Sequence, residues 1–273
     1  MATRDEPWPQ GTPSWVDLMV DDAEAAARFY YDLFGWESEA GSPETGGYPI
    51  AMLGGRAVAG IESVPPGAQM PSVWATYIAV DDLDATATRV TEHGGTIMMG
   101  PMDVMDQGRV AVAADPTGAV FGMWQAQQHI GAGRVNEAGS PIWNECTTRD
   151  YEAAKRFYAG VFGYDLQEVG DGQSFHYSLL NLGGNTVGGL GAPAADTPAD
   201  AAPSWLSYFA VDDSRGRHRR DRGRGRHGRC IDPGPATRQR VRPAGCARWS
   251  PRRGVRGDQA ERAVRRGRQL SPH

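Results

Sequence analysis

The sequence predicts an α+β fold made of tandem β-α-β-β-β units, and two observations lead to it. A segment at 13–36, PSWVDLMVDDAEAAARFYYDLFGW, returns 128 positions later at 141–164 as PIWNECTTRDYEAAKRFYAGVFGY. Within each copy, apolar residues first alternate as in a strand and then recur at helical spacing. Self-similarity at a fixed separation marks a duplicated structural unit, so each copy predicts the other.

The first elements expected in each copy are a half-buried strand and an amphipathic helix. Alternation over 15–20 sends successive side chains to opposite sides of a sheet. Asp22 is the expected N-cap of the helix and Gly35 its end, and Asp150 and Gly163 take these roles in the second copy. The expected strand faces are Val16, Leu18 and Val20 toward the core, and Trp15, Asp17 and Met19 toward the concave side, where the second copy has Trp143, Glu145 and Thr147.

A hairpin and a second unit are expected to follow. Glycine pairs at tight turns separate the apolar runs here. The expected elements are strands at 48–53 and 56–63, a strand at 74–80, a helix at 82–93, strands at 109–114 and 119–125, and a second-copy hairpin at 176–182 and 185–191. A complete copy therefore contains two β-α-β-β-β units.

Length and connectors predict two domains. The chain has 273 residues, which suits two domains of ordinary size. The expected boundaries are an N-terminal arm at 1–12, a first domain at 13–126, a linker at 127–140, a partial second domain at 141–213, and an aberrant, disordered tail at 214–273.

Three motifs carry a family resemblance. They are Ala25-Ala-Ala-Arg-Phe-Tyr30, Phe34-Gly-Trp36 and Asp115-Pro-Thr-Gly-Ala-Val-Phe121. In this arrangement they resemble the vicinal oxygen chelate superfamily of glyoxalases, bleomycin-resistance proteins and extradiol dioxygenases, and in particular its tandem glyoxalase-like branch in actinobacteria. The resemblance covers about residues 11–213. It implies two glyoxalase-like domains with open, concave mixed sheets that hold a ligand, the second of them incomplete.

The same resemblance implies strand positions that supply ligands to a divalent metal. Counted from the helix Phe-Tyr pair, these positions fall at Trp15, Gly60, Ala75 and Gly122, and in the second copy at Trp143, Gly189 and Leu206. None of these side chains binds a hard or borderline cation. A register shift of two residues would bring Asp17 and Glu145 to the first position. We expect no cofactor, with a divalent Fe, Ni, Zn or Mn ion as the alternative.

A repeated Trp-x-acid pair stands where the metal ligands would be. Asp17 and Glu145 are the expected catalytic residues, because a desolvated carboxylate binds a hydroxyl or amine or acts as a general base. The alternative is a partly solvated acid that bridges to a neighbouring strand or Arg. Aromatic rings on the same face would wall a pocket for a small, flat or hydrophobic molecule, unless they are plain core. The expected ligand-binding residues are Trp15, Trp143, Tyr77 and Tyr208.

Charge divides the chain at Asp213. Residues 1–213 hold nine Arg or Lys and 29 Asp or Glu, whereas residues 214–273 hold nineteen Arg, no Lys and four acids. The codons of 252–261, read one nucleotide later, can spell GAVFAVIKLS, which is close to GAVFGMW at 118–124. We interpret the tail as a shifted reading frame. The alternative is an Arg/Gly-rich segment that binds nucleic-acid phosphates.

A shifted frame removes the helix and strands of a fourth unit. We therefore expect a marginal second domain, with an exposed sheet edge and an uncovered apolar face at 205–211.

The favoured function is binding of a small molecule by a glyoxalase-like protein without a metal. The alternative is a metal-dependent lyase, hydroxylase or dioxygenase that acts on a small aldehyde or an aromatic, polyketide-like metabolite. No signal peptide or membrane-spanning run is expected, and the three cysteines form no disulfide or zinc pattern, so the expected location is the cytoplasm. The expected partner is a small-molecule ligand. Membranes are not expected, nucleic acid is disfavoured, and a homodimer stays open.

Overall fold

The structure is a computed structural model that describes residues 3–39, 47–65, 71–171, 173 and 175–211. All of these residues belong to one compact unit. The interpretation of 214–273 as a disordered, frame-shifted tail, and the alternative of nucleic-acid binding through it, lie outside the described residues.

The first repeat forms one eight-stranded mixed sheet with two helices. The strand order is β2-β3-β4-β1-β5-β8-β7-β6. β1 is parallel to β4 and antiparallel to β5, so two β-α-β-β-β units join where β1 meets β5. The elements are β1 (Pro13–Val20), α1 (Ala23–Phe34), β2 (Glu37–Glu39), β3 (Ile50–Met52), β4 (Ala57–Ser63), β5 (Val73–Ala79), α2 (Leu83–Glu92), β6 (Thr96–Val104), β7 (Gly108–Ala114) and β8 (Val120–Ala126).

The second repeat forms a five-stranded sheet in the order β10-β11-β12-β9-β13. β9 is parallel to β12 and antiparallel to β13, as β1 is to β4 and β5. The predicted α+β fold of tandem units is confirmed. The elements are β9 (Pro141–Thr147), α3 (Tyr151–Phe162), β10 (Asp165–Glu168), β11 (Tyr177–Leu182), β12 (Asn185–Gly191) and β13 (Ser204–Phe209).

The predicted helix signals act as expected. The carboxylate of Asp22 accepts from the backbone nitrogen of Ala25 at 2.8 Å, and Asp150 does the same for Ala153 at 3.1 Å. Such a side-chain acceptor satisfies one of the amide donors that the first turn leaves unpaired. Gly35 and Gly163 end α1 and α3 with φ of 77° and 72°, a left-handed conformation that glycine adopts without steric cost.

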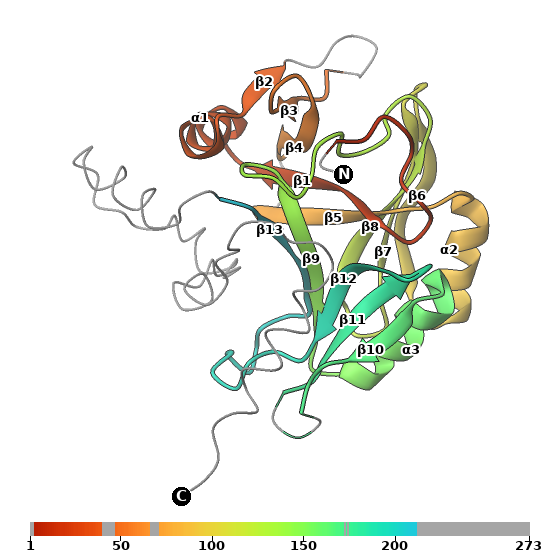
Figure 1. The fold of residues 1–273 in the computed structure, drawn as a ribbon. Coiled ribbons are helices and arrows are strands. Elements are labelled where there is room, and N and C mark those ends of the chain that lie inside the picture. The colour runs from red at the N-terminus through yellow and green to blue at the C-terminus, as the bar shows by residue number, and fades with distance from the viewer. Residues whose placement is uncertain (1–2, 40–46, 66–70, 172, 174, 212–273) are drawn as a thin grey trace, which may run out of the picture. The chain divides into compact units, whose positions relative to one another are not determined.

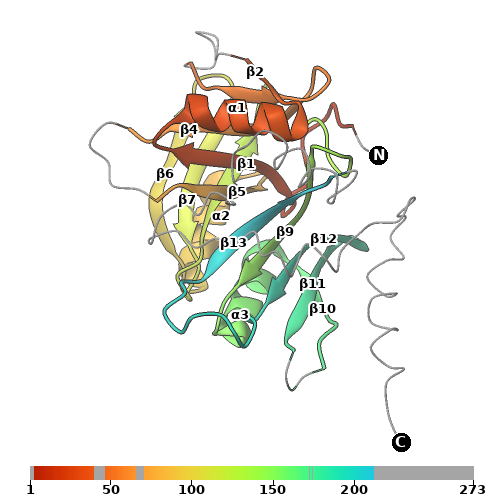
Figure 2. The same cartoon turned by 90° about the vertical axis from the view of Figure 1, so that its left-hand side faces the viewer.

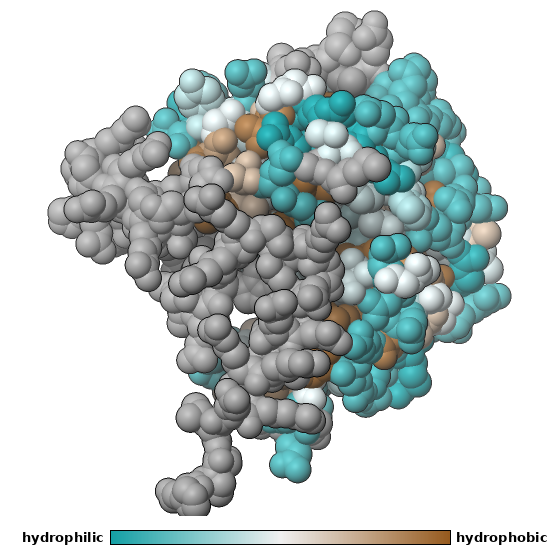
Figure 3. Space-filling model, in the orientation of Figure 1, coloured by the Kyte–Doolittle hydropathy of each residue, from teal (hydrophilic) through white to brown (hydrophobic). Residues whose placement is uncertain are grey.

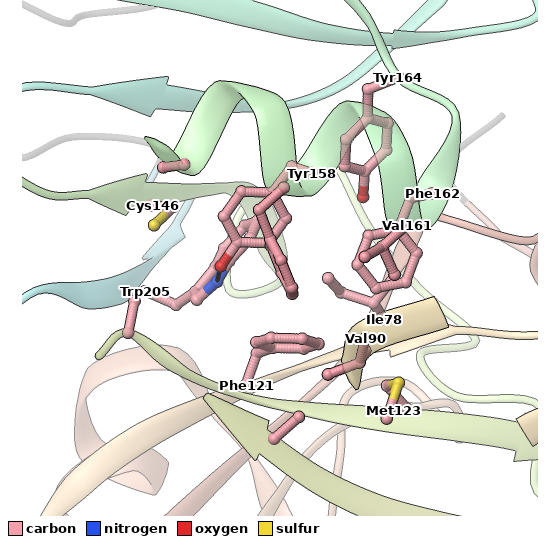
Figure 4. Close-up of a cluster of buried hydrophobic side chains, with 14 of the residues drawn as sticks. Ile78, Val90, Phe121, Met123, Cys146, Tyr158, Val161, Phe162, Tyr164 and Trp205 are labelled. Atoms are coloured by element: carbon pink, nitrogen blue, oxygen red, sulfur yellow. Dashed lines mark hydrogen bonds between the residues drawn. The ribbon is translucent and has the colours of Figure 1, made fainter. Parts of the chain in front are cut away.

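The largest core joins the second unit of the first repeat to the second repeat. α2 and α3 lie beside each other, whereas α1 lies apart from them (Figures 1 and 2). Phe121 from β8 packs against Phe157, Tyr158 and Phe162 of α3, with ring centroids 5.9 to 6.0 Å apart. Figure 4 shows the ring of Phe121 near those of Tyr158 and Phe162. A separate cluster under α1 is built on Val16, Leu18 and neighbouring apolar residues. The expected core face of the first strand is therefore confirmed.

Two features differ from the sequence analysis. The short strands β2 and β10 and the longer β6 were not predicted, since none shows clean alternation in the sequence. Trp205 was expected on an uncovered apolar face, and this was wrong, because its side chain is only 2 % exposed. Its indole nitrogen donates to the Tyr158 hydroxyl at 2.8 Å, so α3 covers it.

No helix among the described residues has both the length and the apolar character needed to cross a membrane.

Candidate ligand-binding site

In the first repeat, the structure brings Trp15, Asp17 and Tyr77 together on adjacent strands. The indole nitrogen of Trp15 donates to Oδ1 of Asp17 at 2.7 Å. The hydroxyl of Tyr48, just before β3, donates to the same oxygen, and Tyr77 of β5 also hydrogen bonds to the carboxylate. Trp15 is only 5 % exposed, and the other three side chains are half-buried. The result is a carboxylate held among aromatic rings.

This environment changes the acidity of Asp17. Burial raises its pKa to about 6, although the hydrogen bonds from Tyr48, Trp15 and Tyr77 partly oppose the change. Desolvation disfavours the charged carboxylate, whereas donors stabilise it. The side chain keeps some accessible surface, so the energetic consequence is smaller than for a fully enclosed acid. Asp17 is therefore a carboxyl that titrates near neutral pH.

The second repeat builds the same cluster around Glu145. The hydroxyl of Tyr177 donates to Oε2 and that of Tyr208 to Oε1, each at 2.7 Å. The indole nitrogen of Trp143 donates to the Tyr177 hydroxyl at 3.1 Å. Trp143 and Glu145 are half-buried, and Tyr208 is 44 % exposed. The Glu145 cluster is thus more open than its counterpart at Asp17.

Glycines make room for both clusters. A Cβ on Gly60 would lie 1.7 Å from the Tyr48 hydroxyl and 2.1 Å from Oδ1 of Asp17. A Cβ on Gly189 would lie 1.9 Å from the Tyr177 hydroxyl. Atoms cannot approach so closely, so only glycine permits these tyrosines to reach the acids.

The connector after β8 covers part of the first cluster. His129 meets the Trp15 ring edge-on at 4.5 Å, and its Nε2 is buried without a hydrogen-bond partner among the described residues. Burial lowers the pKa of His129 to about 4, so it is neutral near pH 7. A cavity of about 190 Å³ adjoins this connector, lined in part by Trp8, Trp124 and Ile130. Nothing comparable covers Glu145 within the described part of the chain.

The six site residues expected from the sequence lie in two groups, with Trp15, Asp17 and Tyr77 together in the first repeat and Trp143, Glu145 and Tyr208 together in the second. Tyr48, Tyr177 and His129 were not expected from the sequence. The repeat itself contained a signal for the two tyrosines. Tyr48 and Tyr177 each stand at the start of a hairpin, the same distance before the glycine that pairs with the acid, Gly60 or Gly189. His129 lies in a connector that has no second copy to compare, so no signal marked it.

Similarity to known proteins identifies the family of this chain. The model of the Glyoxalase/Bleomycin resistance protein/Dioxygenase superfamily matches residues 12–123. A Mycobacterium tuberculosis protein whose name marks it as a candidate glyoxylase, CFP32, is 46 % identical over 212 residues, which span 75 % of this chain and 79 % of that one. The chain belongs to this superfamily.

Two further similarities are informative. The anthracycline biosynthesis protein DnrV of Streptomyces peucetius is 34 % identical over 253 residues, covering 82 % of this chain and 90 % of that one. The Mn(II)-bound glyoxalase of Novosphingobium aromaticivorans superposes with a TM-score of 0.55 at 15 % identity, over 79 % of this chain and 72 % of that one. At this identity the second similarity speaks for the fold alone.

The described residues at the strand positions that the resemblance implies for metal ligands do not fit a divalent metal. Asp17, rather than Trp15, lies in register with Gly60 and Ala75, and Glu145 likewise pairs with Gly189 and Leu206. The shift of two residues that the sequence analysis left open therefore places one acid in each set, and its neighbours carry no ligand atoms. The described residues contain no group of three or more His, Cys, Asp or Glu side chains that could hold an ion. A single carboxylate that already accepts hydrogen bonds from tyrosines offers too few ligand atoms to coordinate such a cation.

Proposed function

We propose that this protein binds a small, flat or hydrophobic molecule against the Glu145 cluster, without a metal. The observation that carries the proposal is a half-buried carboxylate between Trp143 and two tyrosines, one of which is 44 % exposed. Rings would contact the body of the ligand, and the carboxylate would accept from its hydroxyl or amine.

The carboxylate keeps acceptor capacity for such a ligand. Two carboxylate oxygens offer about four lone-pair directions, and the tyrosines use one on each oxygen. A bound donor would therefore use one of the two remaining directions without displacing either tyrosine. If a reaction follows binding, the same carboxylate would take a proton from that donor. At Asp17, by contrast, Trp15 and Tyr48 both use Oδ1, and His129 closes over Trp15.

The relatives support the same class of ligand. DnrV is named for anthracycline biosynthesis, and an anthracycline contains flat, fused aromatic rings with hydroxyl groups. A flat hydroxylated ring system suits a site that offers aromatic faces and one anionic acceptor. We propose the class of molecule and not an individual metabolite.

The test uses 2-hydroxyanthraquinone, which is flat and carries one hydroxyl that does not chelate metals with its carbonyls. Isothermal titration calorimetry gives the Kd for the wild-type chain, Glu145→Gln and the matched Asp17→Asn. We expect E145Q to weaken binding about tenfold, the loss of roughly one charged hydrogen bond. D17N should leave the Kd within about twofold. Equal affinity of E145Q and the wild type would rule the proposal out.

A further inference from the structure

The two repeats bury their first helices to very different degrees. In α3, six side chains are buried: Tyr151, Ala154, Phe157, Tyr158, Val161 and Phe162. In α1, which the structure describes in full, no side chain is buried, although it carries the same apolar pattern 128 positions earlier. Phe29, the counterpart of Phe157, is 43 % exposed, and apolar surface shows around α1 at the upper left of Figure 3.

The partner that covers α3 is the second unit of the first repeat. Phe121, at the end of the sequence Gly118-Ala-Val-Phe121, contacts three aromatic rings of α3. The equivalent rings in α1 belong to Phe29, Tyr30 and Phe34. An equivalent cover for α1 would come from a unit that follows β13, as the second unit follows β5.

The strand that would lead into such a unit already lies at α1. Phe209 of β13 packs against Phe34, Trp36 and Trp74. Its counterpart Ile78, 131 positions earlier, lies in the core under α3. Trp74 donates to Tyr30 at 3.1 Å, as Trp205 donates to Tyr158 at 2.8 Å. The residues beneath α1 therefore repeat the Trp–Tyr hydrogen bond found beneath α3.

We propose that α1 and Phe209 form the docking surface of a fourth β-α-β-β-β unit, and that this occupant is the segment after Asp213 translated one nucleotide later. In that reading, codons 252–256 can spell Gly-Ala-Val-Phe. This sequence begins 39 positions after Asp213, close to the 36 positions that separate Gly118 from Asp82. Its phenylalanine would take the place on α1 that Phe121 takes on α3.

The segment is also long enough. Residues 214–273 number sixty, whereas the second unit needs only the forty-four residues from Leu83 to Ala126 after the matching Asp82. The described chain reaches Val211 just beyond Phe209, so the fourth unit would begin beside the surface it covers. A second copy of this chain offers no equivalent cover, because its second unit is already engaged by its own α3.

Hydrogen–deuterium exchange tests the proposal on two proteins. One is the 273-residue chain, and the other comes from the same coding sequence with the first nucleotide of codon 214 removed. We expect α1 to exchange faster than α3 in the 273-residue chain, and to slow at least about tenfold in the frame-restored protein. An α1 that is already as protected as α3 in the 273-residue chain, whether monomeric or dimeric by sedimentation, would overturn the proposal. So would unchanged exchange in a folded frame-restored protein.

Two substitutions in the 273-residue chain keep the test valid if the restored protein fails to fold. Phe29→Asp should shift Tm by less than about 2 °C, because its docking partner is missing. The matched Phe157→Asp should lower Tm by more than about 10 °C, because α3 is covered. An equally large loss for F29D would show that another occupant covers α1.

Discussion

Tyr208 donates its hydroxyl hydrogen to Oε1 of Glu145 at 2.7 Å, and this pair repeats the contact between Tyr77 and Asp17 in the first repeat. The two acids lie in register with Gly189 and Gly60 on the neighbouring strands. A duplicated cluster offers matched substitutions, because a change in one repeat has a control in the other.

The first prediction concerns the pH dependence of stability at Asp17. Its pKa is about 6 in the folded protein and 3.8 as the ordinary value, so the folded state retains a proton over this interval that the unfolded state releases. The contribution of Asp17 to the free energy of unfolding should therefore fall as pH rises from about 4 to 6, by about 2 kcal/mol after discounting for the accessible part of the side chain. Urea unfolding of the wild type and of Asp17→Asn at several pH values measures it, because the unfolding free energy of the wild type relative to that of D17N should show this decline. A pH profile of D17N parallel to that of the wild type would contradict the assignment.

His129 should act in the opposite direction. Burial lowers its pKa from 6.5 to about 4. Between these pH values the imidazole is protonated in the unfolded state and neutral in the folded state. Stability should therefore fall as the pH drops through this interval. In the wild type the contributions of Asp17 and His129 oppose each other. His129→Gln should expose a decline in stability from pH 4 to 6, whereas D17N should expose a rise.

The glycines beside the tyrosines should not tolerate a side chain. Gly60→Ala and Gly189→Ala place a Cβ within 2 Å of a tyrosine hydroxyl, and we expect each to cost about 2 kcal/mol of unfolding free energy. Gly133→Ala is the control, since its Cβ would meet no atom closer than 3.7 Å and should change stability by less than about 0.5 kcal/mol. Urea midpoints measure all three variants. Tolerance of alanine at Gly60 and Gly189 would mean that the tyrosines lie elsewhere.

The Tyr158 hydroxyl, which accepts from Trp205, should contribute more to stability than the Tyr30 hydroxyl, its counterpart in the first repeat. Tyr158→Phe leaves the buried indole N–H of Trp205 without an acceptor, and we expect a loss of about 2 kcal/mol. Tyr30→Phe removes the acceptor of Trp74, which is half-buried and can reach water, so the loss should stay below about 1 kcal/mol. Thermal unfolding of both variants measures the difference. Equal losses would contradict the unequal burial of α1 and α3.

Much of this fold could be predicted from the duplication alone. Several of its signals depend only on neighbouring residues and can therefore be recognised in the sequence. They are the strand alternation at 15–20, the capping residues Asp22 and Asp150, and the helix-ending glycines Gly35 and Gly163. The contact between α2 and α3 could not be predicted, because no local sequence pattern indicates which unit of the first repeat packs on the second repeat. For the same reason Trp205 was wrongly expected to be uncovered, since the helix that covers it is distant in the sequence.

The candidate site could be predicted in part. The repeated Trp-x-acid pairs marked the two strands, and alternation placed the acids and rings on one face. Tyr48 and Tyr177 reach the acids from a neighbouring hairpin, and His129 from a connector, so their places depend on tertiary packing. The residues that set the environment of the acids are therefore the ones that pattern reasoning missed.

The central claim, ligand binding at Glu145 without a metal, is tested most directly by the Kd of 2-hydroxyanthraquinone before and after metal removal. The wild-type protein is titrated by calorimetry, dialysed against EDTA and then against chelator-free buffer, and titrated again. We expect binding in both titrations, with Kd values within about twofold. Absence of binding in the first titration, or its loss after EDTA and recovery on addition of Fe, Ni, Zn or Mn, would contradict the account.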